Sequence, residues 1–139
     1  MNIFSYICIK LNKKYYVMEN ILKSNSNPIE TLINNYSMEF IILIDEMETT
    51  KSSILLGIKN GKVEAYENII DDLELLIDNK NNIKYFNIQI LLTNYLMEIL
   101  RLKNEMKTTP SSIRPWGIMS GKVKVYENVI KDLIFLNIS

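Results

Sequence analysis

The sequence predicts a mainly α-helical protein made of two copies of one helical hairpin. The first observation is an internal duplication: residues 28–76 align with residues 87–136, with Arg114 as an insertion, and 26 of the 49 aligned positions are identical. The second is that apolar residues in each copy recur at steps of three and four, which places them on one side of a helix. The third is a Ser- and Thr-rich break, TTKSS in one copy and TTPSS in the other. We therefore expect four helices.

Residues 1–27 precede the duplication and have no counterpart in it. The stretch YICIKLNKKYYVM alternates apolar residues around a polar NKK, which favours a small β-hairpin. A helix remains an alternative for this segment, because its apolar residues also fit a helical spacing. That spacing is given by Phe4, Ile7, Leu11, Tyr15, Met18 and Leu22.

The first helix of each copy carries one apolar stripe that is expected to face a core. In the first copy it consists of Ile29, Leu32, Ile33, Tyr36, Phe40, Leu43 and Met47. In the second copy it consists of Ile88, Leu91, Leu92, Tyr95, Ile99, Leu102 and Met106. Ser and Thr in the following break can accept hydrogen bonds from the first N–H groups of the next helix. Pro28, Pro110 and Pro115 fit helix starts or breaks, since proline suits a first turn and not a helix interior.

The second helix of each copy has a matching stripe and a pair of glycines at its start. The stripes are Val63, Tyr66, Ile70, Leu73 and Leu76, and Val123, Tyr126, Ile130, Leu133 and Leu136. Glycines at i and i+4 let a partner helix approach closely, although each costs about 1 kcal/mol of helix propensity. We expect six scaffold residues on these helices: Gly57, Gly61, Tyr66, Gly117, Gly121 and Tyr126.

One hairpin cannot bury both of its faces, so two copies packed about a pseudo-twofold axis are expected to form a four-helix assembly. The alternative is that each hairpin packs separately on the N-terminal segment. The predicted organisation is an N-terminal segment (1–27), a first repeat (28–78), a linker (79–86) and a second repeat (87–139). A monomer with this internal pseudo-dimer and a homodimer both remain open.

The formal net charge of zero hides an uneven distribution. Residues 28–78 contain 11 acidic and 3 basic side chains, whereas residues 87–139 contain 4 acidic and 7 basic ones. These charges are interpreted either as attraction between the halves and solvated faces, or as two distinct binding faces. The zero total argues against an acidic DNA mimic and a uniformly basic nucleic-acid binder.

Positions that differ between the copies are the candidate partner-binding residues. Ile42 and Ile44 lie off the apolar stripe, so we expect them to be exposed beside an acidic face, as in partner sites. Basic residues with Trp116 and Tyr126 nearby suggest nucleotide or nucleic-acid binding as an alternative. The candidates are Ile42, Ile44, Glu64, Asp71, Arg101, Lys103, Arg114, Trp116, Lys124 and Lys131. Lys107 and Lys122 extend the basic set.

Most catalytic arrangements are excluded by composition. The chain has no histidine and only one cysteine, Cys8. This removes Ser-His-Asp and Cys-His catalysis, zinc sites built from His and Cys, and the di-iron pattern of helical bundles. GIKNGKV is not a P-loop, because three residues separate its glycines and valine follows its lysine.

Carboxylates leave one enzymatic alternative, a magnesium-dependent nucleotide phosphohydrolase. EAYENIIDD in the first copy superficially resembles the acidic motif of helical pyrophosphohydrolases, but Glu64 and Asp71 are lysines in the second copy. The repeated acids are Glu39, Glu46, Glu67 and Asp72, matched by Glu98, Glu105, Glu127 and Asp132. The preferred interpretation is that they cap, pair or solvate the bundle, with no metal, no cofactor and no catalytic residue.

The location expected from the sequence is cytoplasmic. No apolar run approaches the length of about 18 residues that spans a bilayer, which excludes a membrane partner. The positive charges at the start follow the apolar part, the wrong order for a signal peptide.

The cadence G-x-x-x-G-K-x-x-x-Y-E-x-(I/V)-I-x-D-L occurs at residues 57–73 and again at 117–133. It resembles the second helix of small helical proteins encoded by phages and prophages of low-GC bacteria. The resemblance implies a binding protein of a mobile element, such as an anti-CRISPR or other anti-defence inhibitor, and transfers no functional residue. The function expected is therefore a non-enzymatic protein–protein interaction module that inhibits by occlusion.

Overall fold

The computed structural model describes residues 27–78 and 87–138, and within these ranges all regular structure is helical. The helices are α2 (Pro28–Met47), α3 (Ser53–Asp78), α4 (Ile88–Met106) and α5 (Arg114–Ile138). The mainly α fold predicted from the sequence is confirmed. The expected N-terminal β-hairpin, apart from Asn27, and the expected linker at 79–86 lie outside the described residues.

Short polar side chains define the helix ends. Asn27 Oδ1 accepts a hydrogen bond from the Ile29 N–H at 2.9 Å, and Asn87 Oδ1 accepts one from the Ile90 N–H at 3.0 Å. Ser52 Oγ accepts from the Leu55 N–H at 3.3 Å at the start of α3. The threonines of the break act differently from the expectation: Thr50 and Thr109 donate their hydroxyl protons back to carbonyl groups at the ends of α2 and α4.

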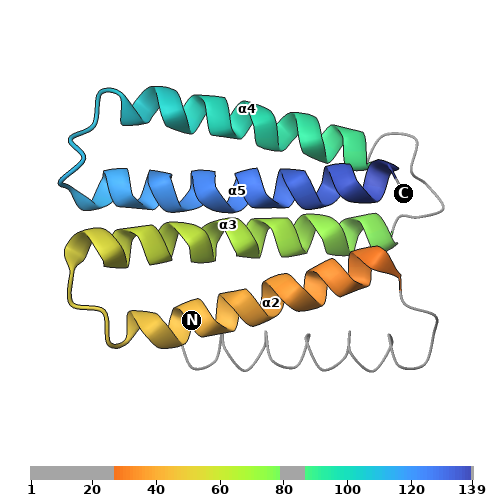
Figure 1. Ribbon diagram of the computed structural model, residues 1–139, viewed down its shortest axis with the longest axis horizontal. Helices are drawn as coiled ribbons and strands as arrows, with labels where there is room; N and C mark the ends of the chain where they lie inside the picture. The colour runs from red at the N-terminus through yellow and green to blue at the C-terminus, as the bar shows by residue number, and fades with distance from the viewer. Residues whose placement is uncertain (1–26, 79–86, 139) are drawn as a thin grey trace.

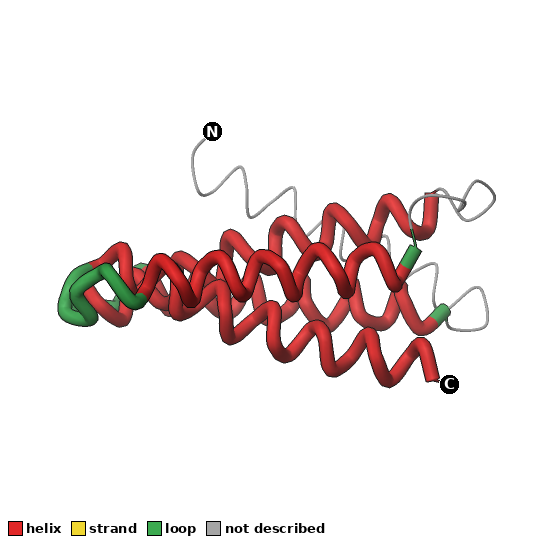
Figure 2. The backbone as a smooth tube through the Cα atoms, turned by 90° about the horizontal axis from the view of Figure 1, so that it is seen from above, coloured by secondary structure: helices red, strands yellow, loops and turns green. Residues whose placement is uncertain are grey.

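The four helices lie side by side in the order α4, α5, α3, α2 (Figure 1). Both hairpin loops lie at the same end of the molecule, so α3 and α5 run parallel in the centre while α2 and α4 run in the opposite direction (Figures 1 and 2). A pseudo-twofold axis between α3 and α5 relates the two hairpins. The alternative of two hairpins packing separately on the N-terminal segment is wrong, because α3 and α5 pack directly on each other.

Glycine makes this central contact possible. A Cβ atom added at Gly57 would stand 2.8 Å from the backbone oxygen of Arg114, and one added at Gly117 would stand 2.8 Å from that of Ile54. At Gly61 and Gly121 an added Cβ would approach the facing backbone more closely still. The spacing of the glycines was predicted to admit a partner helix, and the partner is the equivalent helix of the other copy.

The core lies along the central pair and is sealed by the outer helices. Its best buried side chains come from all four helices, and most are the apolar stripe residues expected from the sequence. They include Ile33, Phe40, Ile69, Leu73, Leu91, Leu102, Val129 and Leu133.

Candidate interaction surfaces

Two reciprocal hydrogen bonds tie each outer helix to the second helix of the other copy. The Tyr36 hydroxyl on α2 donates to Asp132 Oδ2 on α5 at 2.6 Å, and the Tyr95 hydroxyl on α4 donates to Asp72 Oδ2 on α3 at 2.8 Å. Tyr36 and Tyr95 are equivalent in the two copies, as are Asp72 and Asp132. The pseudo-twofold axis therefore relates the two bonds to each other. The face that carries the first bond is the counterpart of the face that carries the second.

The protonation of these groups suits the donor roles of the tyrosines. Burial first, and the neighbouring carboxylate second, raise the pKa of Tyr36 and Tyr95 well above the ordinary value of a phenol. Burial also raises the pKa of Asp72; the hydrogen bond from Tyr95 lowers it and the negative charge of Asp71 raises it. Both aspartates thus serve the scaffold, although the sequence also allowed them a metal-binding role.

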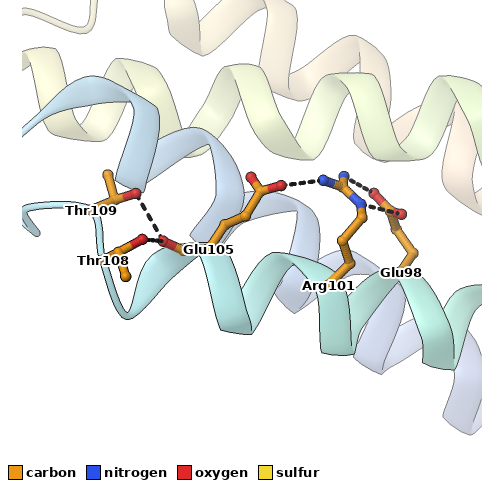
Figure 3. A network of polar contacts seen from close by, with 5 residues as sticks. All are labelled: Glu98, Arg101, Glu105, Thr108 and Thr109. Carbon is orange, nitrogen blue, oxygen red and sulfur yellow. Dashed lines mark hydrogen bonds and ion pairs between the residues drawn. The ribbon is translucent and has the colours of Figure 1, made fainter.

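Ile42 and Arg101 occupy equivalent positions and behave differently. Ile42 is 46% exposed on α2, as the sequence predicted. Arg101 binds two carboxylates of its own helix: Nη2 lies 2.5 Å from Glu98 Oε1, and Nη1 lies 2.6 Å from Glu105 Oε1 (Figure 3). Hydrogen bonding to Arg101 lowers the pKa of Glu98, against a smaller opposing effect of burial. The guanidinium is therefore neutralised on its own helix.

The prediction that Ile44 is exposed is wrong. Ile44 is only 7% exposed and packs with Phe40, Leu43 and Val63. The apolar surface of α2 is wider near its end than the stripe assumed, because there it also packs against Val63 and Tyr66 of α3. Its counterpart Lys103 is exposed, and its Nζ lies 3.8 Å from Glu127 Oε2 on α5.

The charge differences between α3 and α5 produce two unlike surfaces at equivalent positions. On one face, Lys122 Nζ lies 3.0 Å from Glu64 Oε2, with Asp71 exposed on the same helix as Glu64. On the other face, Lys62, the equivalent of Lys122, lines a hollow of about 260 Å³ together with Lys124 and Lys131. We call this hollow the lysine pocket. None of its three lysines makes an ion pair with a described residue.

A larger groove adjoins the lysine pocket. This α2–α5 groove has a volume of about 620 Å³ and is lined by Met38, Ile42 and Tyr36 among others. Tyr66 and Asn128 line both hollows, so the two form one continuous surface. Sequence reasoning identified Ile42, Lys124 and Lys131 separately, and the structure brings them to the same face.

Other basic and aromatic candidates are not gathered there. Lys122 is bound to Glu64 and Arg101 to Glu98 and Glu105. Arg114 begins α5 and packs its backbone against Gly57, and the half-buried Trp116 lies in the same first turn. The Tyr126 ring packs on that of Tyr95, with centroids 5.2 Å apart, as Tyr66 packs on Tyr36 at 5.7 Å. The expected stacking cluster of Arg114, Trp116 and Tyr126 is therefore spread along α5.

The sequence reasoning missed an apolar stripe on α4. Leu96, Met97 and Leu100 are 51%, 65% and 68% exposed, and one turn of helix separates the first two from the third. We call them the α4 stripe. They lie off the buried stripe of α4, where helical spacing alone does not tell whether another part of the chain covers them.

No described part of the chain offers a metal centre or a bilayer-spanning helix. Within residues 27–78 and 87–138, no three acidic side chains lie close enough together to hold a metal ion. In the same residues, no helix combines the length and apolar content of a membrane span. No protein family, curated protein or solved structure matches this chain. Its function is therefore argued from its surfaces alone.

Proposed function

We propose that the protein is a non-enzymatic interaction module that binds another protein through the α4 stripe. The supporting observation is the exposure of Leu96, Met97 and Leu100 next to one another on one helix. A contiguous apolar patch bordered by polar residues is typical of a protein–protein interface. Covering such a patch gains about 25 cal/mol for each Å² of apolar surface removed from water.

A module that binds without reacting acts by occupying a surface of its partner. The proposed consequence is inhibition by occlusion. An origin in a mobile element and a target within a host defence complex rest on the helix cadence alone, and both stay predictions.

Affinity capture from the native host, followed by mass spectrometry, tests the proposal. The wild-type chain is expected to retain one macromolecular partner, and Leu100→Lys is expected to lose it. Leu55→Lys is the matched control, because Leu55 is also an exposed leucine, 51% accessible, but lies at the start of α3 away from the stripe. Equal recovery of the partner by the wild type and Leu100→Lys would contradict the proposal, as would nucleotide turnover without any retained partner.

Nucleotide or nucleic-acid binding through the second repeat is a second candidate. The observation that favours it is the position of Lys124 and Lys131 in one hollow without an ion-pair partner among the described residues. Phosphate contacts release counterions, so binding of an oligonucleotide must weaken as salt rises. Oligonucleotide binding that is absent, or indifferent to salt, removes this candidate.

A further inference from the structure

The lysine pocket is the clearest difference between the two faces of the molecule. Lys62 and Lys122 are equivalent and both half-buried, but their neighbours differ in charge. Lys122 has Glu64 beside it at 3.0 Å, whereas Lys62 shares its hollow with Lys124, the equivalent of Glu64, and Lys131, the equivalent of Asp71. The same scaffold thus neutralises one lysine and surrounds the other with positive charge.

An anionic occupant is the natural complement of this hollow. Three ammonium groups around about 260 Å³ repel one another, and an anion among them removes that repulsion. Glu127 also lines the pocket, but its carboxylate lies 3.8 Å from Lys103 and is one negative charge against three positive ones. The pocket therefore keeps an excess of positive charge.

The adjoining α2–α5 groove adds an apolar requirement, and it also carries two carboxylates, Glu39 and Asp132, the second of which accepts the hydrogen bond from Tyr36. Ile42 and Met38 expose 46% and 43% of their surface along it, and Tyr66 and Asn128 join it to the pocket. A ligand that fills both hollows therefore presents apolar groups to Ile42 and Met38 and keeps its negative charge at the lysine pocket, away from the carboxylates of the groove. An acidic amphipathic peptide segment combines the two, as in recognition of a helix by a groove.

The chemistry of the pocket favours carboxylates over a nucleotide. The Tyr66 ring packs on Tyr36, with centroids 5.7 Å apart, so it is already engaged by another aromatic ring. Trp116, the aromatic side chain best suited to stack on a base, does not line either hollow. We propose that the lysine pocket and the α2–α5 groove together bind an acidic amphipathic segment of a partner protein.

This site lies outside the α4 stripe, so a separate experiment tests it. A displayed library of random peptides is selected against the wild-type chain and against Lys124→Glu with Lys131→Asp, which gives the pocket the charges of its counterpart. Both side chains are exposed, so the double variant is expected to fold. The control is Lys51→Glu with Lys107→Glu, which makes the same change in net charge at exposed positions that line neither hollow.

Peptides selected by the wild type are expected to carry acidic residues beside apolar ones. Fluorescence anisotropy should show that the pocket variant weakens their binding by about tenfold or more, that the control leaves it within about twofold, and that Ile42→Arg also weakens it. ATP and a single-stranded oligonucleotide serve as competitors.

Three outcomes would overturn the proposal: selected peptides without acidic residues, binding indifferent to the pocket variant, or displacement of the peptides by ATP or oligonucleotide at lower concentration than by free acidic peptide. Leu100→Lys leaves this peptide binding unchanged, which separates a failure here from a failure of the α4 proposal.

Discussion

The two faces related by the pseudo-twofold axis share a scaffold and differ in surface chemistry. On both, a tyrosine of an outer helix bonds an aspartate of the opposite copy, at 2.6 Å and 2.8 Å. Around these bonds, one face carries Ile42 and the lysine pocket, whereas the other carries Arg101 held by two glutamates. Packing fixes the residues that both copies must bury, and the solvent-facing positions are free to diverge.

The largest expected effect is a loss of stability when a central glycine is replaced in one of the two similar scaffolds. Gly61→Ala is expected to lower the free energy of unfolding by about 3 kcal/mol, because the new methyl group meets the rigid backbone of Ile118 and forces α3 and α5 apart. Alanine's higher helix propensity, about 1 kcal/mol, does not offset this. Urea unfolding followed by circular dichroism measures the change.

Gly121→Ala is the matched variant, because its methyl group meets the backbone of Ile58 in the same way. The two losses should agree within about 1 kcal/mol. Stability unchanged in either variant would show that the central helices do not pack as closely as described.

Removing either tyrosine–aspartate hydrogen bond should lower the stability by less than the glycine substitutions do, and by different amounts on the two faces. Tyr95→Phe is expected to cost about 1–2 kcal/mol, because it leaves the half-buried Asp72 without its donor. Tyr36→Phe should cost less, because Asp132 is exposed and water can replace the hydroxyl. The same urea unfolding experiment compares them, and a larger loss for Tyr36→Phe would contradict the stated difference in exposure.

The smallest expected effect is the pH dependence contributed by Asp72. Its pKa is raised in the folded state, mainly by burial, so the folded chain binds this proton more tightly than the unfolded chain. The resulting stability is present below the ordinary carboxyl pKa of about 3.9 and is lost as pH rises through the raised folded value.

Asp72→Asn removes this titration. The stability of the wild type relative to the variant should therefore fall as pH rises from about 3.9, by less than about 1 kcal/mol, since the group is half exposed. Urea midpoints at a series of pH values measure it, with Asp45→Asn as the control at an exposed position of α2. A rise of the relative stability over the same range would mean that the bond from Tyr95 outweighs burial.

Much of the fold could be predicted because it depends on local periodicity and on internal repetition. Most residues of the stripes through Tyr36 and Tyr95 are buried and the others partly buried, as their spacing requires, and the paired glycines mark a close contact between helices. Ile44 could not be placed correctly, because the width of a buried face depends on how far a neighbouring helix overlaps it. The threonines of the break could cap either the helix before or the one after, and hydrogen-bond geometry rather than composition selected the former.

The candidate surfaces were less predictable than the fold. Comparing the two copies singled out Ile42, Lys124 and Lys131 as positions of divergence, but not their common face. The sequence also grouped Arg101 with the free basic residues, although Glu98 and Glu105, at i−3 and i+4, bind it on the same helix. The α4 stripe was missed, because an apolar residue beyond a helix's main stripe does not reveal whether anything covers it.

The sequence by itself determined the helical class, the duplication and the pairing of glycines, because helical periodicity and repetition are local properties of a chain. Only the tertiary structure decided which differences between the copies act together. Lys62 comes from the first repeat, whereas Lys124 and Lys131 come from the second. They share a pocket because α3 and α5 run parallel in contact, an arrangement set by the burial of both hairpins against each other.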